Sequence, residues 1–550
     1  MLSLKGYQII INRPENPLLI KELLKQKNKN IQFLKKDIKI FLEDIENKII
    51  NFDKGINFLG DVIKNKKKIG IIGDYDADGT IATSIIVNFL KHINYPHCYY
   101  IPNRFKDGYG PSQTIIEEMY NKEVEVIIMV DTGTKANIEV ALAENLGMKV
   151  VILDHHLPSE DLPNASILIN PHINGHFNYF CGAGLTFIFF SKLQKFLIKN
   201  NILNKDNIFL FNDLLDLVAV ATVCDFVPLK DLNRSLVYYG LEKIKKNPYI
   251  AFKIIYENNP SNNINDASDL GFYIGPYLNV AGRIEDANMV VEFLTTKDIK
   301  KLNYYFNRIK IMTAERKYLQ NKMIQKIEMN IQNTNDIFIA NEEFHEGIIG
   351  IVASQMKQKY NRTSCVISIK DNICKGSMRT NDNFSATDFI EMALKENLLI
   401  KGGGHARAGG FSLKKKNLDL LENYFYKYGN NFINSIQNIF VSSILDFTNI
   451  NEKIYKEIHQ IGPFGIENEE FVFLFPFLRI NNFFLLQNKH ISFYLKHFYK
   501  SKSIKALYFN FPMKLIYKIQ KNNIIHLIGN IKYNKYFYIN IIDIVVTNIN

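Results

Sequence analysis

The sequence predicts an α/β protein with a mostly parallel, doubly wound sheet in its first large domain. Three observations lead to this fold class. Between residues 67 and 156, short apolar runs alternate with segments of helical periodicity, which is typical of strands joined by crossover helices. Residues 298–332 are charged and contain neither glycine nor proline, so they predict one long connecting helix. From about residue 440, short runs rich in Phe, Tyr and Ile predict a small OB-like β module.

The elements of the first domain can be placed in order along the chain. Four apolar runs predict strands: Ile69–Ile72, Cys98–Pro102, Val124–Val130 and Lys149–Leu153. Helical periodicity follows the first three, over Thr80–Phe89, from about Pro111 and after Lys135. Further helical patterns fill residues 184–225, and a loop is expected over Gly275–Arg283. Because parallel strands point the same way, the loops that follow them meet at one edge, where open α/β sheets bind ligands.

Changes in composition and periodicity along the chain also predict its domain limits. A second, smaller α/β unit is expected from Asp336 to Leu413, after the long helix. We therefore expect an N-terminal extension over residues 1–50, a first α/β domain over 51–297, a connecting helix over 298–332, a smaller α/β domain over 333–415 and an OB-like module over 440–550.

Length and composition exclude some classes of protein. The chain has 550 residues, of which 47% are hydrophobic and 22% are charged, so it is not a disordered or fibrous protein. At roughly 150 residues a domain, this length corresponds to about three to four domains. Lys and Arg exceed Asp and Glu by 67 to 55, a net charge of +12, which suits a polyanion such as nucleic acid. A compositional bias toward Lys and Asn would give the same excess without any such partner, so the charge leaves both interpretations open.

The cysteines and the hydrophobic runs bear on the compartment. The five cysteines are scattered, with no C-x-x-C pair, which argues against a disulfide framework and a thiolate zinc site. Lys5, Arg13 and Glu15 interrupt any signal-peptide core, and the apolar run that begins at Phe471 ends at Arg479, well short of a membrane span. The sequence predicts a cytoplasmic protein with no membrane partner.

The most specific local pattern is the acidic segment Gly73–Gly79. Asp74, Asp76 and Asp78 alternate directly after an apolar run. An EF-hand loop starts with the same pattern, but its twelfth position must be a bidentate Glu, and here that position is Ile85. This excludes the EF-hand and leaves two interpretations of the segment taken alone, a polar turn that caps a helix or part of a cation site.

Other element ends favour the cation site. Asp131 follows the third apolar run, Asp154-His155-His156 follow the fourth, and Asp225 ends an apolar stretch that begins at Leu214. Carboxylates gathered in one crevice repel one another and are costly to desolvate unless cations lie among them. Oxygen ligands with one imidazole suit Mg²⁺ or Mn²⁺ better than Zn²⁺. Two such ions would stabilise both the attacking and the leaving oxygen of a phosphoryl displacement.

Taken together, these segments resemble the DHH phosphoesterase superfamily, named for the triad seen here as Asp154-His155-His156. Within it the sequence is similar to the RecJ family of single-strand-specific 5′→3′ exonucleases. The segments that match follow one another in order along the chain: Gly73–Gly79, Ile101–Gly110, Val130–Gly133, Asp154–His156, Asp225–Leu229, Gly275–Arg283, His345–Ala353, Gly402–Gly410 and Gly462–Glu470.

The resemblance implies a metal-dependent phosphodiester hydrolase. The residues that match the metal ligands of the family are Asp76, Asp78, Asp131, His155 and Asp225. His156 matches the second histidine, expected beside the scissile phosphate or behind a ligand. The implied cofactors are two divalent cations, Mn²⁺ or Mg²⁺, which activate a water, so that no side-chain nucleophile is required. Asp74 is left open between a ligand and a residue that orients the loop.

The resemblance also implies substrate contacts. The smaller α/β domain is similar to the DHHA1 domain, in which Gly403 and Gly404 would let backbone N–H groups approach a phosphate and His405 would contact it. Arg379 is a further candidate for a phosphate contact in that domain, and Arg104 and Arg283 are candidates for holding a terminal 5′-phosphate. Two positions depart from the family. Tyr277 stands where an arginine is common, and Met378 interrupts an expected small-residue turn before Arg379.

The implied function is a single-stranded-DNA-specific exonuclease that degrades 5′→3′ to nucleoside 5′-monophosphates in DNA repair and recombination. Its expected partners are single-stranded DNA, a single-strand-binding protein and a RecQ-like helicase, and the chain is expected to be a monomer. Two alternatives remain. Smaller DHH enzymes degrade short oligonucleotides, 3′-phosphoadenosine phosphate or cyclic dinucleotides but generally lack the C-terminal third seen here. A non-catalytic nucleic-acid-binding scaffold would have lost ligands, whereas all five are present.

Overall fold

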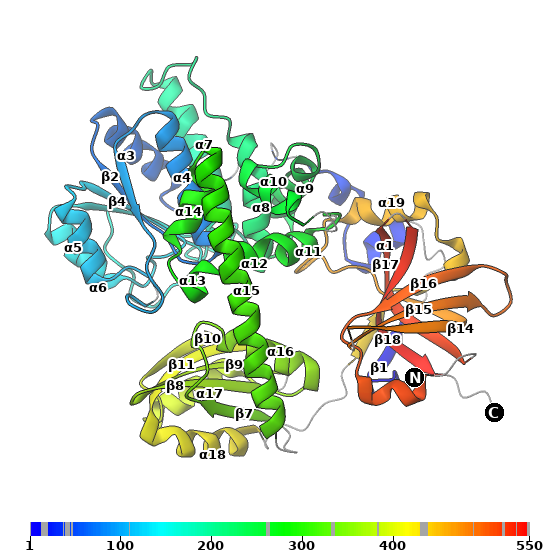
Figure 1. The fold of residues 1–550 in the computed structure, drawn as a ribbon. Coiled ribbons are helices and arrows are strands. Elements are labelled where there is room, and N and C mark those ends of the chain that lie inside the picture. Colours follow the sequence, from blue (N-terminus) through cyan, green and yellow to red (C-terminus); the bar gives the residue numbers. More distant parts are fainter. Residues whose placement is uncertain are drawn as a thin grey trace. The chain divides into compact units, whose positions relative to one another are not determined.

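The computed structural model describes residues 2–12, 20–36, 38, 45, 48–108, 110–259, 264–331, 336–381, 384–429, 438–487, 489–519, 523–534 and 536–546. Contacts divide the chain into two compact units, drawn in Figure 1 and described separately here. The first unit comprises residues 27–313 and 459–470. The second unit comprises residues 1–26, 314–458 and 471–550.

The first unit is built on the parallel sheet that the sequence predicts. Five strands pair in the order β3-β2-β4-β5-β6, and every pairing is parallel. The strands are β2 (Ile69–Ile72), β3 (His97–Tyr100), β4 (Val126–Val130), β5 (Lys149–Leu153) and β6 (Ile167–Ile169). The central strands β2, β4 and β5 are apolar and almost wholly buried, as expected for strands covered on both faces.

Helices cover both faces of this sheet, which makes it doubly wound (Figure 1). Alternate residues of β4 enter opposite cores: Ile128 and Val130 pack with one set of helices, and Ile127 and Met129 pack with the other. The helices of the larger core are α3 (Phe52–Lys64), α4 (Ala77–His92) and α7 (Gly182–Lys199), and those of the smaller core are α5 (Gln113–Asn121) and α6 (Asn137–Asn145).

Further helices follow in the first unit. They are η1 (Ile31–Leu34), η2 (Phe211–Leu214), α8 (Leu215–Cys224), α9 (Asp231–Lys246), α10 (Ile250–Glu257), α11 (Ala267–Asp269), η3 (Leu270–Ile274), α12 (Gly275–Leu278), α13 (Ala281–Ile284) and α14 (Asn288–Thr295). The loop predicted over Gly275–Arg283 is wrong, because this segment forms the short helices α12 and α13. Pro276 lies in the first turn of α12, where its missing N–H leaves no helical hydrogen bond unmade.

The long helix predicted over residues 298–332 is observed as α15 (Ile299–Asn330). It contributes residues to both units, since the division falls between Thr313 and Ala314. The predicted end of this helix, at residue 332, lies outside the described residues.

The second unit contains the smaller α/β domain. Its five-stranded sheet has the order β10-β11-β9-β8-β7, in which only β7 and β8 are parallel. The elements are β7 (Ile337–Asn341), α16 (Ile349–Tyr360), β8 (Ser364–Lys370), β9 (Ile373–Arg379), α17 (Ala386–Lys395), β10 (Lys401–His405), β11 (Ala408–Lys414), η4 (Lys415–Asn417) and α18 (Leu418–Gly429). Leu421 and Phe425 of α18 pack in the same core as Phe389 of α17.

The second unit also contains the predicted OB-like module. Six strands pair in the order β13-β14-β15-β16-β18-β17, and a further pairing of β14 with β17 closes the sheet into a barrel. The strands are β13 (Ser443–Ile444), β14 (Phe473–Leu486), β15 (His490–His497), β16 (Ser503–Tyr508), β17 (Ile524–Asn534) and β18 (Tyr536–Val546). The short helices η5 (Phe447–Asn449), α19 (Glu452–Ile461) and η6 (Met513–Lys518) lie in the same part of the chain.

The chain's N-terminal residues join this module. Strand β1 (Gln8–Ile11) pairs in parallel with β12 (Asn438–Val441), and the Leu4 N–H donates to the Ile544 carbonyl at 2.6 Å. Helix α1 (Ile20–Gln26) is tied on by Gln26, whose side chain donates to the Ser442 carbonyl at 3.2 Å. The sequence predicts an N-terminal extension over residues 1–50 but not these contacts, because a parallel pairing across more than 400 residues of chain leaves no local signal.

The domain limits predicted at residues 50, 297, 415 and 440 stay predictions. Within the described residues, we find no helix that is at once long and apolar enough to cross a membrane.

Candidate metal centre and active site

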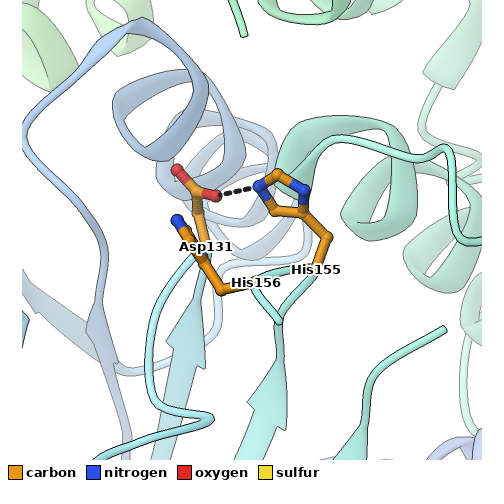
Figure 2. Close-up of side chains that lie close together, drawn as sticks. All are labelled: Asp131, His155 and His156. Carbon is orange, nitrogen blue, oxygen red and sulfur yellow. Dashed lines mark ion pairs between the residues drawn. The ribbon is translucent and has the colours of Figure 1, made fainter. Parts of the chain in front are cut away.

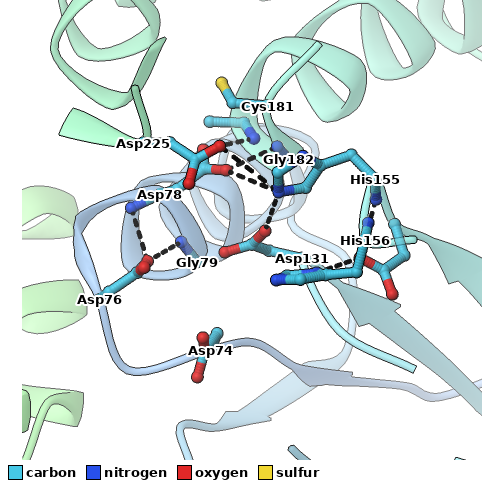
Figure 3. Close-up of polar contacts among 12 residues, drawn as sticks. Asp74, Asp76, Asp78, Gly79, Asp131, His155, His156, Cys181, Gly182 and Asp225 are labelled. Atoms are coloured by element: carbon cyan, nitrogen blue, oxygen red, sulfur yellow. Dashed lines mark hydrogen bonds and ion pairs between the residues drawn. The ribbon is translucent and has the colours of Figure 1, made fainter. Parts of the chain in front are cut away.

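The acidic side chains predicted from the sequence come together at the carboxyl edge of the parallel sheet (Figure 3). Asp74 follows β2, Asp131 follows β4 and His155 follows β5, so three neighbouring strands deliver them to the same edge. Asp76 and Asp78 lie at the start of α4, and Asp225 lies at the end of α8. The predicted grouping of these residues is therefore observed.

Backbone N–H groups at helix N-termini hold the carboxylates of Asp76 and Asp78. Asp76 is the N-cap of α4, and its Oδ1 accepts from the Asp78 N–H at 2.9 Å and the Gly79 N–H at 3.1 Å. Asp78 is 1% exposed, and its two oxygens accept from the Gly182 and Ala183 N–H groups at 2.6 and 2.8 Å, at the start of α7. Both carboxylates are thus fixed by backbone donors, while their remaining lone pairs are available to a cation.

Glycines allow the close approach of these elements. A Cβ on Gly79 would lie 2.5 Å from the Asp74 backbone nitrogen, and a Cβ on Gly182 would lie 2.6 Å from the Asp131 Cβ. A larger residue at either position would displace a carboxylate of the cluster. These two glycines therefore set the spacing between α4, α7 and the strand ends.

His155 lies at the centre of the cluster. Its Nε2 is 3.0 Å from Asp131 Oδ1, as Figure 2 shows, and 3.6 Å from Asp225 Oδ2 and 3.7 Å from Asp78 Oδ2. Burial lowers the pKa of His155, which favours the neutral imidazole, the form that ligates a metal. One imidazole nitrogen therefore faces three carboxylates from three different elements.

Asp154 orients the second histidine. Its Oδ1 accepts from the His155 N–H at 2.7 Å and from His156 Nδ1 at 2.8 Å, and its Oδ2 accepts from the Thr134 N–H at 2.9 Å. Burial alone would lower the pKa of His156, but the hydrogen bond and the charge of Asp154 outweigh it and raise this pKa to about 9. His156 is therefore a cation at neutral pH, held in one orientation beside the acidic cluster.

In most other carboxylates of the cluster, the charged form is disfavoured. Burial, followed by the charge of Asp78, raises the pKa of Asp131 well above its ordinary value. Burial and the neighbouring carboxylates likewise raise the pKa of Asp74, Asp76 and Asp225. Like charges at this density disfavour one another, and a bound cation relieves that cost.

The donor set fits divalent cations. Asp131 Oδ1, His155 Nε2 and Asp225 Oδ2 are buried and have no hydrogen-bond partner among the described residues. Ligand atoms within 4.8 Å of one another fall into three groups: Asp74, Asp76 and Asp131; Asp78, His155 and Asp225; and Asp131, His155 and His156. All five predicted ligands occur in these groups, together with Asp74 and His156. Carboxylate oxygens with one imidazole are ligands typical of Mn²⁺ and Mg²⁺.

Two predicted arginines lie beside this cluster. The Arg104 guanidinium lies over the Tyr75 ring, 5.5 Å from its centroid, and Tyr75 stands between Asp74 and Asp76 in the chain. Burial raises the pKa of Tyr75 to about 12, although the charges of Arg104 and Arg283 act to lower it. Gly282, the chain neighbour of Arg283, packs against Tyr75, since a Cβ there would lie 2.5 Å from the Tyr75 carbonyl oxygen. The structure therefore brings Arg104 and the segment that carries Arg283 beside the acidic cluster.

The other predicted contacts lie in the second unit. Gly403, Gly404 and His405 belong to the exposed edge strand β10. Arg379 ends β9, and its Nη1 donates to Ser377 Oγ at 3.1 Å and to the Met378 carbonyl at 2.8 Å. The small-residue turn expected before Arg379 is wrong, because that segment is strand β9. Met378 is fully buried there and belongs to the core.

Tyr277, the other position that departs from the family pattern, packs within the first unit. Its ring centroid lies 5.9 Å from that of Phe306, and its hydroxyl accepts from the Asn259 side-chain amide at 3.2 Å.

Sequence reasoning missed the supporting roles of three residues. Asp154 was counted among the acidic element ends but given no orienting role, and Gly182 was not noted. Asn279, whose Oδ1 accepts from the Ala77 N–H at 2.9 Å, was part of a matched segment without a role. Only Asp154 carried a signal of its own, an aspartate directly after a strand.

Comparison with known proteins agrees with this geometry. Family models match the DHH family N-terminal domain over residues 68–222, the DHHA1 domain over 333–428 and the RecJ OB domain over 441–547. A curated relative from Escherichia coli (strain K12), the single-stranded-DNA-specific exonuclease RecJ, is 31% identical over 393 residues, which cover 68% of each chain. The chain belongs to the RecJ family of exonucleases.

Solved structures of the family share the fold. RecJ from Thermus thermophilus in complex with Mn²⁺ matches with a TM-score of 0.79 at 20% identity, covering 98% of this chain and 79% of that one. A structure of exonuclease RecJ bound to manganese matches with a TM-score of 0.59 at 26% identity, covering 70% of this chain and 96% of that one. The three matched models follow one another along this chain in the order DHH, DHHA1 and RecJ OB.

Proposed function

We propose that this chain is a metal-dependent, single-stranded-DNA-specific exonuclease that degrades its substrate 5′→3′ to nucleoside 5′-monophosphates. The observation that carries the proposal is the cluster of buried carboxylates around His155, with three ligand atoms that have no hydrogen-bond partner among the described residues. The substrate class comes from the relatives, since the curated proteins are named single-stranded-DNA-specific exonucleases.

Two divalent cations, Mn²⁺ or Mg²⁺, are proposed as cofactors. Asp76 and Asp131, with Asp74, would hold one, and Asp78, His155 and Asp225 would hold the other. Such ions lower the pKa of water and neutralise charge on a phosphodiester. The 26% identical relative that was solved with manganese supports this class of ion. Asp74 is thereby proposed as a ligand, the alternative to a purely orienting role.

The chain's own residues have separate tasks in this proposal. His156 is held by Asp154 as an imidazolium, so its second ring nitrogen can donate a hydrogen bond to a phosphate oxygen beside the cations. Arg104 and Arg283, at the border of the crevice, would hold a terminal 5′-phosphate and so set the direction of degradation. Hydrolysis releases a nucleoside 5′-monophosphate when water attacks the phosphate that joins the first two nucleotides.

The second unit would contribute further phosphate contacts of its own. Gly403 and Gly404 lie on the exposed edge strand β10, where their backbone N–H groups can approach a phosphate closely. His405 and Arg379 are the proposed side-chain contacts of this domain. A role in DNA repair and recombination, with a single-strand-binding protein and a RecQ-like helicase as partners and a monomeric state, is part of the proposal by family resemblance alone.

The assay that tests this function uses a 5′-phosphorylated single strand labelled at its 3′ end, incubated with Mn²⁺ or with EDTA. A duplex and a dinucleotide are assayed in parallel. We expect Mn²⁺-dependent shortening from the 5′ end with release of mononucleotides, and no degradation of the duplex.

Three outcomes would contradict the proposal. Cleavage of the dinucleotide alone would indicate a small-nucleotide phosphodiesterase. Strand binding without cleavage would indicate a scaffold. Equal cleavage in EDTA would remove the cations from the mechanism.

A further inference from the structure

A short segment from the C-terminal third of the chain is built into the first unit. Residues 459–470 belong to this unit, although the segments before and after them belong to the second. We call residues 459–470 the clasp. It lies more than 200 residues along the chain from the α8–α9 loop that it contacts.

A buried arginine fastens the start of the clasp. Arg234 of α9 is 2% exposed, and its Nη2 donates to the carbonyls of Ile461 and Gly462 at 2.9 Å each and of Gln460 at 3.2 Å. Its guanidinium also stacks on the Phe33 ring, 3.9 Å from the centroid. A guanidinium buried with carbonyl acceptors is costly to leave unpaired, so α9 and the clasp are strongly coupled.

The end of the clasp is a tight turn with its own support. The N–H of Gly465 donates to the Asn468 carbonyl at 3.0 Å, and the Asn468 N–H donates back at 3.1 Å. The Asn468 side chain, 1% exposed, donates to the carbonyls of Pro463 and Ile461 at 2.8 and 3.2 Å. The shape of the turn is therefore fixed by hydrogen bonds within the clasp itself.

The turn contacts the loop between α8 and α9. The Leu229 N–H donates to the Ile466 carbonyl at 2.8 Å, and Lys230 Nζ pairs with Glu467 Oε2 at 3.0 Å. Leu229 is buried against Gly465, where an added Cβ would lie only 2.6 Å from Leu229 Cδ1. One backbone hydrogen bond, one ion pair and one close van der Waals contact thus join the clasp to this loop.

The same loop begins with Asp225. Only Phe226, Val227 and Pro228 separate that carboxylate from Leu229, and Phe226 has a φ of 56°, which is unfavourable for a bulky side chain. A loop held in such a conformation needs support from its surroundings. The clasp supplies support at the loop's far end.

We propose that the clasp is a positioning element of the metal site, which holds the α8–α9 loop so that Asp225 reaches the cations. This inference rests on the proposed function, because it takes Asp225 as a ligand. It makes a segment between strands β13 and β14 of the OB module part of the first unit's metal site.

The test uses the full-length chain with Gly465→Val, which forces a side chain against Leu229. Lys453→Ala, at an exposed position shortly before the clasp, is the matched control. Hydrogen exchange of residues 225–230 is measured in the metal-free protein, Mn²⁺ affinity by calorimetry, and global stability by thermal unfolding. We expect faster exchange in this loop and Mn²⁺ affinity weakened by about ten-fold or more in Gly465→Val, and neither change in the control.

A charge exchange keeps the proposal testable where Gly465→Val fails to fold. Lys230→Glu places two acids opposite each other and is expected to weaken Mn²⁺ binding, and the added Glu467→Lys is expected to restore it. Unchanged Mn²⁺ affinity and loop exchange in a folded Gly465→Val or in Lys230→Glu would overturn the proposal. A wild-type chain that binds Mn²⁺ without cleaving DNA would instead contradict the exonuclease function and leave the clasp result intact.

Discussion

The carboxylates of the acidic cluster differ in their hydrogen-bond partners. Asp154 accepts hydrogen bonds at both oxygens and serves His156, and Asp78 accepts two backbone N–H groups at the start of α7. Asp131 Oδ1 and Asp225 Oδ2 are buried without such partners among the described residues. Asp154 therefore serves to orient His156, whereas Asp78, Asp131 and Asp225 keep lone pairs that are available to a cation.

The Asp154–His156 pair predicts a pKa change at one residue. Asp154→Asn removes the charge that raises the His156 pKa to about 9, so this pKa should fall toward its ordinary value near 6.5. Because the folded-state pKa lies above the unfolded one, the pair stabilises the fold fully below about pH 6.5 and loses this contribution as the pH rises through 9. An NMR titration of the histidine ring signals in the metal-free protein measures the shift. Asp161→Asn at the exposed surface is the control, and an unaltered His156 pKa in Asp154→Asn would contradict the assignment.

The unpartnered carboxylates predict how cation binding depends on pH. The pKa values of Asp131 and Asp225 are raised in the folded state, so the metal-free fold loses stability as the pH rises from about 4 through those values. A cation that replaces the protons should therefore stabilise the protein more at high pH. We expect Mn²⁺ to raise the Tm by more at about pH 7.5 than at about pH 5.5. Thermal unfolding with and without Mn²⁺ tests this, and an equal or larger rise at the lower pH would contradict it.

At the scale of elements, the start of α7 is the most sensitive support of the site. A Cβ on Gly182 would lie 2.6–2.9 Å from the atoms of the Asp131 side chain, whereas a Cβ on Gly184 would meet its first neighbour at 3.5 Å. Gly182→Ala should therefore displace Asp131 and reduce hydrolysis by about 100-fold, as loss of a supporting contact at a metal site does. Gly184→Ala, in the same helical turn, is the matched control. Similar rates for the two variants, measured on a single strand with Mn²⁺, would argue against this role of α7.

The elements also show what sequence patterns can and cannot predict. The strands β2, β4 and β5 were predicted because buried parallel strands are continuous apolar runs that end at polar loops. The helices α12 and α13 were missed because they are only four residues long and contain glycine, so they have no amphipathic period. The pairing of β1 with β12 and the clasp were missed because both join segments that are far apart in the chain.

The same distinction applies to the site. Its five predicted ligands could be found from their place at the ends of apolar runs and from the family's motifs. Gly182 could not, because its role depends on the position of α7 against Asp131, a contact that only the folded chain reveals.

The whole molecule carries a net charge of +12, and its proposed substrate is a polyanion. Binding of single-stranded DNA should weaken as salt rises, because each phosphate contact releases counterions and contributes about 0.7 to the log–log slope. Arg104→Ala should lower that slope by about one contact. Fluorescence anisotropy over a series of salt concentrations measures it, with Lys64→Ala, at the exposed end of α3, as the control. A slope near zero in the wild-type chain would show that phosphate contacts do not contribute to DNA binding.

The proposed function is that the acidic cluster around His155 hydrolyses single-stranded DNA. Its most direct test compares His155→Ala with His176→Ala, an exposed histidine outside the cluster, in single-turnover cleavage of a 5′-phosphorylated strand with Mn²⁺. We expect His155→Ala to lose at least about 100-fold in rate while its affinity for the strand stays close to that of the wild type, because the imidazole would ligate a cation and the strand is held elsewhere. His176→Ala should cleave like the wild type. A His155→Ala variant that cleaves at the wild-type rate would contradict the assignment of this crevice as the active site.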